Sequence, residues 1–302
     1  MATKNWTIDD MADQSGKTIL ITGGNSGIGL EAARVLSLKN AEVILTARSA
    51  EKGTTAVEFL KKQNPLANVR WMELDLADLD SVRAFSNAFH ASYSKLDILI
   101  NNAGVMYPPS REETKQNFEL QFGTNHLGHF ALTGLLLDML KATPGSRVTT
   151  QSSIAHTMLN KLDFNDLNWE KTYSRTKAYS QSKLANLLFT YELDRQLKKH
   201  GLGVIANAAH PGVTNTNLFK TSGFEFLTKL FTQAVELGAL PILRAATEPH
   251  LKGSEYVGPK GRGGFRGYPV HVNSTPTSHK EDLAKALWKA SEQLTSIVFD
   301  FS

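Results

Sequence analysis

The sequence predicts an α/β fold in which helices cover both faces of one doubly wound parallel sheet of about seven strands. Short apolar runs of strand length alternate along the 302 residues with longer segments whose apolar residues recur at helical spacing. No linker or shift in composition interrupts this alternation. Because repeated strand and helix units build one parallel sheet, we expect residues 1–302 to form a single domain.

Each expected strand is a short apolar run, and several are followed by a glycine-rich or polar segment. The strands are expected at residues 17–22, 43–45, 69–74, 96–100, 147–151 and 203–209, and the helices at 30–36, at 118–140, from Tyr179 onward and at about 280–297. Ligands of open α/β sheets bind beyond the carboxyl ends of the strands. The residues that follow each run are therefore the candidate site.

The composition is that of an ordinary soluble globular protein, with 41% hydrophobic and 21% charged residues. The 33 Lys and Arg and the 29 Asp and Glu are scattered, so no basic stripe for nucleic acid emerges. The absence of cysteine excludes disulfides, thiolate catalysis and cysteine-ligated metals. No stretch approaches the roughly 18 to 20 apolar residues of a membrane span. We expect a cytoplasmic protein that binds neither nucleic acid nor membrane, and a homo-oligomer is left open.

A glycine-rich turn, residues 23–29, joins the first strand to the following helix. Glycines let the backbone approach a ligand, and the free amides and dipole at a helix start favour a phosphate. The turn therefore predicts a dinucleotide site, although its Gly-x-x-x-Gly-x-Gly spacing departs from the commonest fingerprint. The contacts expected from this turn are Gly23, Asn25, Ser26, Gly27, Ile28 and Gly29.

Arg48 follows the second strand, where an acidic residue would hold the ribose diol of NAD. Arginine instead pairs with the additional phosphate of NADP. The sequence therefore favours NADP, with a solvated arginine as the alternative. Asn25 or Lys52 could also hold this phosphate.

Further candidates follow the remaining strands at the same edge of the sheet. The residues after the fourth strand are small, so the backbone there could lie against a flat ring. The cofactor contacts expected from these strand ends are Asp75, Leu76, Asn102, Ala103, Gly104, Pro211, Gly212, Val213 and Thr214. Asn125, among apolar residues in the middle of an expected helix, is a further candidate, although such an asparagine is usually inert or marks a kink.

Tyr179 and Lys183 are the principal candidates for chemistry. Residues four apart share a helix face, so the lysine ammonium can favour the phenolate and lower the pKa of Tyr179. Tyr173 and Lys177 have the same spacing, but they lie in a polar segment before the apolar run. We therefore rank Tyr179 and Lys183 first.

Two segments are candidates for loops that cover a substrate. Residues 154–178 precede the Tyr179 helix, and residues 215–251 are rich in aromatic and aliphatic side chains. The second segment could cover an apolar pocket, but the packing of a core helix explains its composition equally well.

Together these motifs resemble the short-chain dehydrogenase/reductase family over nearly the whole chain. The resemblance rests on Thr22-Gly23-x-x-x-Gly27-x-Gly29, Asp75, residues 101–104, Asn125, Ser153, Tyr179-x-x-x-Lys183 and Pro211-Gly212. Residues 153–156, the long insert before Tyr179 and residues 267–270 look like the retinol dehydrogenase and WW-domain oxidoreductase branch. The resemblance implies a Rossmann-type fold, a nicotinamide cofactor and a small carbonyl or alcohol substrate. With neither a WW module nor a membrane anchor in this sequence, we expect a stand-alone soluble reductase.

The resemblance also implies the role of each catalytic residue. Tyr179 would give a proton to a carbonyl oxygen or take one from an alcohol, and Ser153 would hydrogen-bond the same oxygen. Lys183 would lower the pKa of Tyr179 and hold the nicotinamide ribose, and Asn125 would position a water in a proton relay. Ser152 is the alternative serine, but Ser153 matches the catalytic position of the family.

Three other interpretations receive less support from the residues. His126 and His129 have a spacing compatible with a metal, but no third ligand completes a site, so we expect none. Residues 258–267 resemble an RNA-binding glycine–arginine tract, but a surface loop suits ten residues within a folded chain better. A non-catalytic NADP-binding sensor is the alternative function, although a sensor would not need the proton-donating residues.

Overall fold

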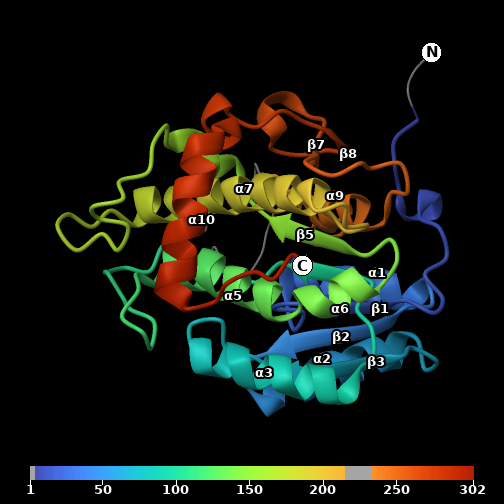
Figure 1. Cartoon of the computed structure of the whole chain (residues 1–302). Coiled ribbons are helices and arrows are strands. Elements are labelled where there is room, and N and C mark those ends of the chain that lie inside the picture. The colour runs from blue at the N-terminus through green and yellow to red at the C-terminus, as the bar shows by residue number, and fades with distance from the viewer. Residues whose placement is uncertain (1–3, 215–232) are drawn as a thin grey trace.

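A central sheet of eight strands organises the computed structural model, which describes residues 4–214 and 233–302 (Figure 1). The strand order is β3-β2-β1-β4-β5-β6-β7-β8; β8 runs antiparallel to β7, and all the other pairs are parallel. The strands are β1 Thr18–Ile21, β2 Glu42–Ala47, β3 Val69–Glu73, β4 Ile98–Asn101, β5 Arg147–Gln151, β6 Ile205–Ala209, β7 Tyr256–Pro259 and β8 Pro269–His271. The predicted doubly wound α/β fold is confirmed, with one strand more than the expected seven.

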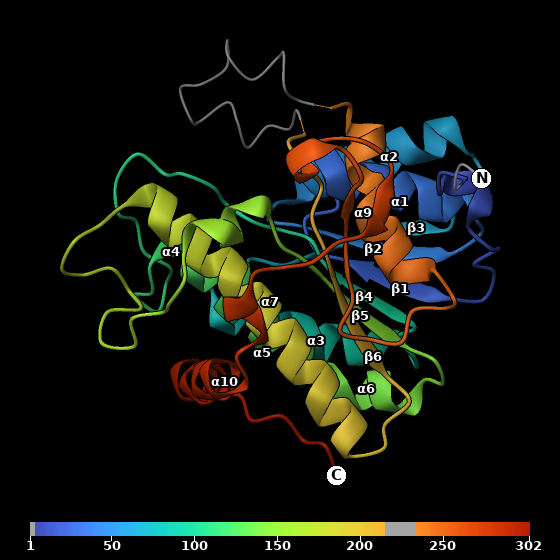
Figure 2. The ribbon, with the colours of Figure 1, turned by 90° about the horizontal axis from the view of Figure 1, so that it is seen from above.

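Helices cover both faces of this sheet, as Figure 2 shows, with α1, α2 and α9 on one side and α3, α5 and α7 on the other. The α-helices are α1 Gly27–Leu38, α2 Ala50–Gln63, α3 Leu79–Ser92, α4 Leu120–Phe122, α5 Gly128–Leu135, α6 Leu137–Ala142, α7 Arg175–Lys199, α9 Val235–Thr247 and α10 Glu281–Thr295. Short 3-10 helices are η1 Ile8–Asp10, η3 Ile154–Met158, η5 Arg262–Gly264 and η6 Pro276–His279, and η2 Gly123–Leu127 is a π-helical turn. None of the helices in the described ranges has the length and apolar character needed to cross a bilayer.

Alternation along the central strands explains the two hydrophobic layers. In β1, Leu20 packs into the layer that contains α3, α5 and α7, whereas Ile19 and Ile21 pack into the layer that contains α1 and α9. All three side chains are fully buried. A strand buried on both faces needs apolar residues at every position, which is why continuous apolar runs identified the central strands.

The helix expected at residues 118–140 is confirmed as α4, η2, α5 and α6, and the π turn η2 within it is the feature that the sequence did not predict. The turn begins at Gly123, where a Cβ would collide with the side chain of Thr114. It ends before Gly128, where a Cβ would lie 2.5 Å from the carbonyl oxygen of Leu76. Tight packing at two glycines therefore accompanies the widened turn, and Asn125 lies in the middle of it.

Other differences from the sequence predictions concern boundaries and the far edge of the sheet. The helix that contains Tyr179 begins four residues earlier than expected, at Arg175. The glycine-rich tract 258–267 is not entirely a surface loop, because Gly258 and Pro259 belong to β7. Of the expected lid at 215–251, residues 215–232 lie outside the described residues. In the remainder, α9 packs into the hydrophobic layer beside α1, as the core-helix interpretation expected.

Candidate active site

The strand order reverses between β1 and β4, which places a crevice at the carboxyl ends of the central strands. Chain continuity brings the segments after β1, β4, β5 and β6 to this edge. They carry the glycine turn, residues 102–104, the serine pair and Pro211–Thr214. These four segments, which carry the residues predicted to form the site, therefore lie at the same edge of the sheet.

The glycine turn leaves space for a ligand against the backbone. Gly23 and Gly27 have φ angles of +63° and +55°, a conformation that other residues rarely adopt. A Cβ on Gly29 would collide with the carbonyl oxygen of Gly23 and lie 2.5 Å from Nδ2 of Asn102. Ser26 precedes α1 without capping it through its side chain. The first amides of this twelve-residue helix therefore lack a side-chain cap from Ser26, and they are the groups that could hold the pyrophosphate of a dinucleotide.

Asn102 joins the glycine turn to the segment after β4. Its Nδ2 donates to the carbonyl oxygen of Thr22 over 2.9 Å, and its backbone N–H donates to Oγ1 of Thr22 over 2.9 Å. The N–H of Ala103 donates to the same Oγ1 over 3.0 Å. The side-chain nitrogen of Asn102 is thus engaged within the protein. This role of Thr22 was not predicted from the sequence, although a threonine directly before a glycine turn is a visible signal.

The candidates after β2 and β3 differ in their exposure. Arg48 is exposed one residue beyond the end of β2, and Lys52 is exposed in α2. Asp75 is half-buried, and its Oδ1 accepts a hydrogen bond of 2.9 Å from the N–H of Ala77. The neighbouring Leu76 is buried against Gly128. Arg48 is therefore free to reach a ligand, whereas one carboxylate oxygen of Asp75 already has a partner.

Lys183 is buried at the centre of the site, with 4% of its surface exposed. Its ammonium donates to the carbonyl oxygen of Gln151 over 3.2 Å and lies 5.6 Å from the centre of the Tyr179 ring. Burial lowers the pKa of Lys183 to about 8. A Cβ on Gly104 would lie 3.1 Å from Oδ1 of Asn125 and 3.6 Å from this nitrogen, so the segment after β4 packs closely against both side chains.

The pKa of Tyr179 is raised well above its ordinary value, which contradicts the expectation that Lys183 lowers it. The main cause is burial, since only 8% of Tyr179 is exposed, and the neighbouring Ser153 hydroxyl opposes the shift. Tyr107 covers the ring edge-to-face, with the two ring centres 5.1 Å apart. The Lys183 ammonium is directed to the Gln151 carbonyl, so desolvation of the phenol prevails.

The two serines after β5 are held differently. Ser152 is buried, and its hydroxyl donates to the backbone carbonyl oxygen of Lys183 over 2.8 Å. Ser153 is half-buried, and its Oγ accepts from the N–H of Ala155 over 3.2 Å. Its hydroxyl lowers the pKa of Tyr179 and so opposes the effect of burial. The geometry thus leaves the Ser153 proton available to a ligand and commits that of Ser152 to the backbone of α7.

Asn125 connects the segment after β4 to α7. Its Oδ1 accepts from the N–H of Val105 over 2.8 Å. Its Nδ2 donates to the carbonyl oxygen of Val105 and to Oγ of Ser182, each over 3.0 Å. Both protons of the amide are therefore used within the protein, next to Lys183 along the chain.

The duplicate pair occupies a different environment. Tyr173 precedes α7, and its hydroxyl accepts from Nε2 of Gln121 over 3.3 Å. Burial raises the pKa of Tyr173 to about 12. Lys177 is exposed to solvent, in contrast to Lys183. The Tyr173 spacing therefore does not bring a buried ammonium beside a phenol.

The segment after β6 is fixed by the loop that follows β7. Gly212 has a φ of +66°, and a Cβ there would collide with the carbonyl oxygen of Phe265. The N–H of Val213 donates to the same oxygen over 2.8 Å. Oγ1 of Thr214 donates to the carbonyl oxygen of Pro211 over 2.8 Å. Pro211–Thr214 therefore form a firmly held turn at the edge of the candidate site.

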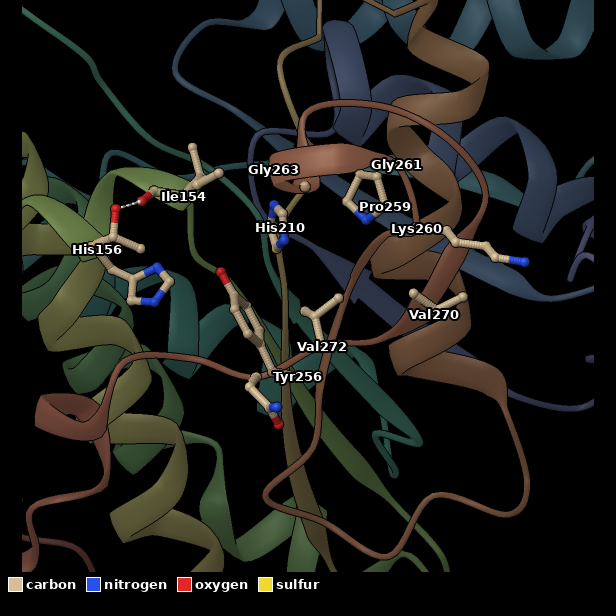
Figure 3. Close-up of a pocket in the computed structure, with 13 residues that line it drawn as sticks. Ile154, His156, His210, Tyr256, Pro259, Lys260, Gly261, Gly263, Val270 and Val272 are labelled. Atoms are coloured by element: carbon tan, nitrogen blue, oxygen red, sulfur yellow. Dashed lines mark hydrogen bonds between the residues drawn. The ribbon is translucent and has the colours of Figure 1, made fainter.

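A cavity of about 290 Å³ lies beside Ile154, the residue that follows Ser153 (Figure 3). Its walls include the side chains of His156, His210 and Tyr256, none of which the sequence analysis selected. His210 directly precedes Pro211, so its place after the sixth strand was a usable signal. Tyr256 lies on β7, a strand that the sequence analysis did not predict.

The paired histidines of the sequence analysis are engaged in separate hydrogen bonds. Nε2 of His126 lies 2.8 Å from Oγ of Ser291, and Nε2 of His129 lies 2.8 Å from Oγ1 of Thr22. Within residues 4–214 and 233–302, no group of three or more metal-type side chains is gathered.

Comparison with known proteins extends these observations over the chain. The family model for short chain dehydrogenases matches residues 17–224. Human retinol dehydrogenase 13 is 40% identical over 287 residues, which span 93% of this chain and 85% of that protein. The chloroplastic short-chain dehydrogenase TIC 32 B of Brassica napus is 42% identical over 248 residues, 78% of this chain and 77% of that protein.

A solved structure gives the same result at the level of the fold. The structure of an uncharacterised protein from Mycobacterium Paratuberculosis superposes with a TM-score of 0.83 at 42% identity, covering 98% of this chain and all of that one. The chain therefore belongs to the short-chain dehydrogenase/reductase family, in the branch that resembles the retinol dehydrogenases.

Proposed function

We propose that the protein is an NADP(H)-dependent carbonyl reductase or alcohol dehydrogenase that acts on a lipophilic aldehyde, ketone or secondary alcohol. The observation that carries this proposal is the arrangement of Lys183, Tyr179 and Ser153 at the carboxyl edge of the sheet, with Lys183 near Gly104 in the segment after β4. Family membership supports the broader class, since members are oxidoreductases that use a nicotinamide cofactor. The cofactor supplies or accepts the hydride when it is bound.

Tyr179 is the proposed general acid. Its raised pKa keeps the phenol protonated near neutral pH, the form needed to give a proton to a carbonyl oxygen. The available Ser153 hydroxyl would hydrogen-bond the same oxygen as negative charge develops on it. The Lys183 ammonium beside the ring would stabilise the phenolate that remains. These protonation states favour the direction of carbonyl reduction.

Asn125 has a structural part in this proposal. Its side chain is hydrogen-bonded to Val105 and Ser182, so it would act by fixing the positions of these two residues beside Lys183. A role in holding a water, which the family resemblance implies, stays a prediction. Both amide protons are already donated within the protein, so any such water would be held by a group other than the Asn125 amide nitrogen.

The preference for NADP rests on Arg48. Its side chain is exposed at the end of β2, where the adenine ribose of a dinucleotide would lie if its pyrophosphate occupied residues 23–29. A guanidinium there can pair with the 2′-phosphate. No other charged group is needed for the proposal, although Lys52 is also exposed nearby in the chain.

The apolar surroundings of Tyr179 support a lipophilic substrate. Met106 and Ala155 pack with Tyr179 in a small buried cluster, and Tyr107 lies against it. A carbonyl compound that reached the phenol would therefore displace water from mainly apolar walls.

The cytoplasmic location, the single domain and a homo-oligomer stay predictions.

A turnover screen tests the proposed function. Purified protein is mixed with NADPH or NADH and a panel of aldehydes, ketones and diketones, and oxidation is followed at the nicotinamide absorbance. We expect reduction of medium-sized lipophilic carbonyls with NADPH preferred. Activity confined to small charged substrates would contradict the substrate class, and cofactor binding without any turnover would favour the sensor.

A further inference from the structure

His129 lies where the nucleotide-binding side and the catalytic side of the site meet. It is the second residue of α5 and only 1% exposed. Its Nδ1 lies 3.0 Å from the backbone carbonyl oxygen of Asn125. Its Nε2 lies 2.8 Å from Oγ1 of Thr22, a residue 107 positions earlier in the chain. Both ring nitrogens therefore have a partner.

The partners determine which nitrogen carries the proton. A carbonyl oxygen can only accept, so Nδ1 donates to Asn125 and Nε2 must accept in the neutral ring. Oγ1 of Thr22 already receives the N–H groups of Asn102 and Ala103. Its own proton has two acceptors within reach, Nε2 of His129 at 2.8 Å and the carbonyl oxygen of Ile100 at 3.4 Å, and the shorter distance favours Nε2. Burial lowers the pKa of His129 to about 4, which keeps the ring neutral.

The carbonyl that His129 bonds belongs to the π turn. In a regular α-helix this oxygen would accept from the backbone N–H of His129, four residues later. In η2 the spacing is five residues, as in the bond from the N–H of Gly128 to the carbonyl oxygen of Gly123. The side chain of His129 adds a hydrogen bond to this irregular turn and helps to fix the backbone of Asn125.

The same ring reaches both halves of the candidate site. On one side, Thr22 holds the start of the glycine turn and the backbone of residues 102 and 103. On the other side, Asn125 holds Ser182, the neighbour of Lys183. No other side chain named in the proposed function contacts both sides.

We propose that His129 is a positioning residue that couples the nucleotide-binding loop to the catalytic pair, through Thr22 at one ring nitrogen and Asn125 at the other. This inference rests on the proposed function. It assigns the two nitrogens separate effects: Nε2 supports cofactor binding, and Nδ1 supports the chemical step.

Two substitutions separate the nitrogens. His129→Asn places an amide donor near the position of Nδ1 but removes the Nε2 acceptor, so the Thr22 hydroxyl keeps only the longer bond of 3.4 Å to the carbonyl oxygen of Ile100. His129→Gln places an amide oxygen near the position of Nε2 but removes the short-range donor to Asn125. With one hydrogen bond lost in each, we expect about tenfold weaker NADPH binding for His129→Asn with kcat nearly unchanged. For His129→Gln we expect about tenfold lower kcat with NADPH binding nearly unchanged.

The measurements are NADPH titration by its fluorescence and turnover at saturating cofactor. His126 is the matched control, because it is buried in the adjoining π turn and bonded to Ser291 of α10 instead of Thr22. His126→Asn and His126→Gln should alter thermal stability but neither NADPH binding nor kcat by more than about twofold. Equal changes in both quantities for the two His129 variants, or no change in either, would overturn the coupling role.

A measurement on the unsubstituted protein covers the case in which the variants do not fold. Nitrogen NMR of histidine-labelled protein should show His129 with its proton on Nδ1 at pH 7, and addition of NADPH should shift the Nε2 signal. A proton on Nε2, or signals indifferent to NADPH, would refute the inference. If the protein binds NADPH but turns over no carbonyl, the proposed function fails alone, because the titration and the NMR still decide the role of His129.

Discussion

Acidification should destabilise the folded chain chiefly through three buried histidines, with His156 and His279, whose pKa values burial also lowers, acting in the same direction. Burial lowers the pKa of His126 to about 3, and of His129 and His210 to about 4, from an ordinary 6.5. At pH 5 the unfolded chain binds protons at these rings and the folded chain does not. Stability is therefore full above about pH 6.5 and falls as pH decreases toward 4. Between pH 8 and 5, each ring accounts for a loss of about 2 kcal/mol, and the three for about 6 kcal/mol.

Such a loss is large against the roughly 5 to 15 kcal/mol of a typical domain. His90 acts in the opposite direction: burial lowers its pKa, but bonds to the Ser86 carbonyl and to Asp138 outweigh this and raise it. His90 lies near the surface, so its opposing effect is small.

Urea unfolding of the cofactor-free chain at pH 8, 7, 6 and 5 gives the free energy of unfolding at each pH. His126→Gln should remove about a third of the pH dependence, or about 2 kcal/mol, whatever its stability at pH 8. The exposed His250→Gln is the control and should retain the full dependence. A loss below about 2 kcal/mol between pH 8 and 5, or a His126 variant with unchanged pH dependence, would refute the reasoning.

Three predictions concern function. Arg48→Asp should lower the preference for NADP over NAD, measured as the ratio of kcat/KM values, at least about tenfold through the lost phosphate pair; an unchanged ratio would move the contact elsewhere. Tyr179→Phe should reduce kcat by about a hundredfold or more with NADPH binding retained, whereas Tyr173→Phe should change turnover only slightly. The reverse result would transfer the role to Tyr173. Gly29→Ala should weaken NADPH binding in a fluorescence titration by more than about tenfold, since its Cβ would meet the Gly23 carbonyl, and unchanged binding would exclude this turn as the site.

The sequence predicted the central strands well because their signal is local. Buried parallel strands are continuous apolar runs, and the ends of six of them were placed within about two residues. The outer strands β7 and β8 were missed, because β7 contains Gly258 and Pro259 and β8 begins with Pro269. Proline and glycine mark turns in sequence reading, yet an edge of a sheet can accept both.

The sequence by itself determined the order of the motifs and hence the edge of the sheet where they meet. Tertiary structure decided how each side chain is used there. The 118–140 helix contains a π turn where two glycines pack against distant backbone and side chains, and the pKa of Tyr179 rises because burial outweighs a lysine that faces another partner. The bond between His129 and Thr22 joins residues far apart in the chain. Desolvation and hydrogen bonding depend on every neighbour in space, and no periodicity in the sequence encodes those neighbours.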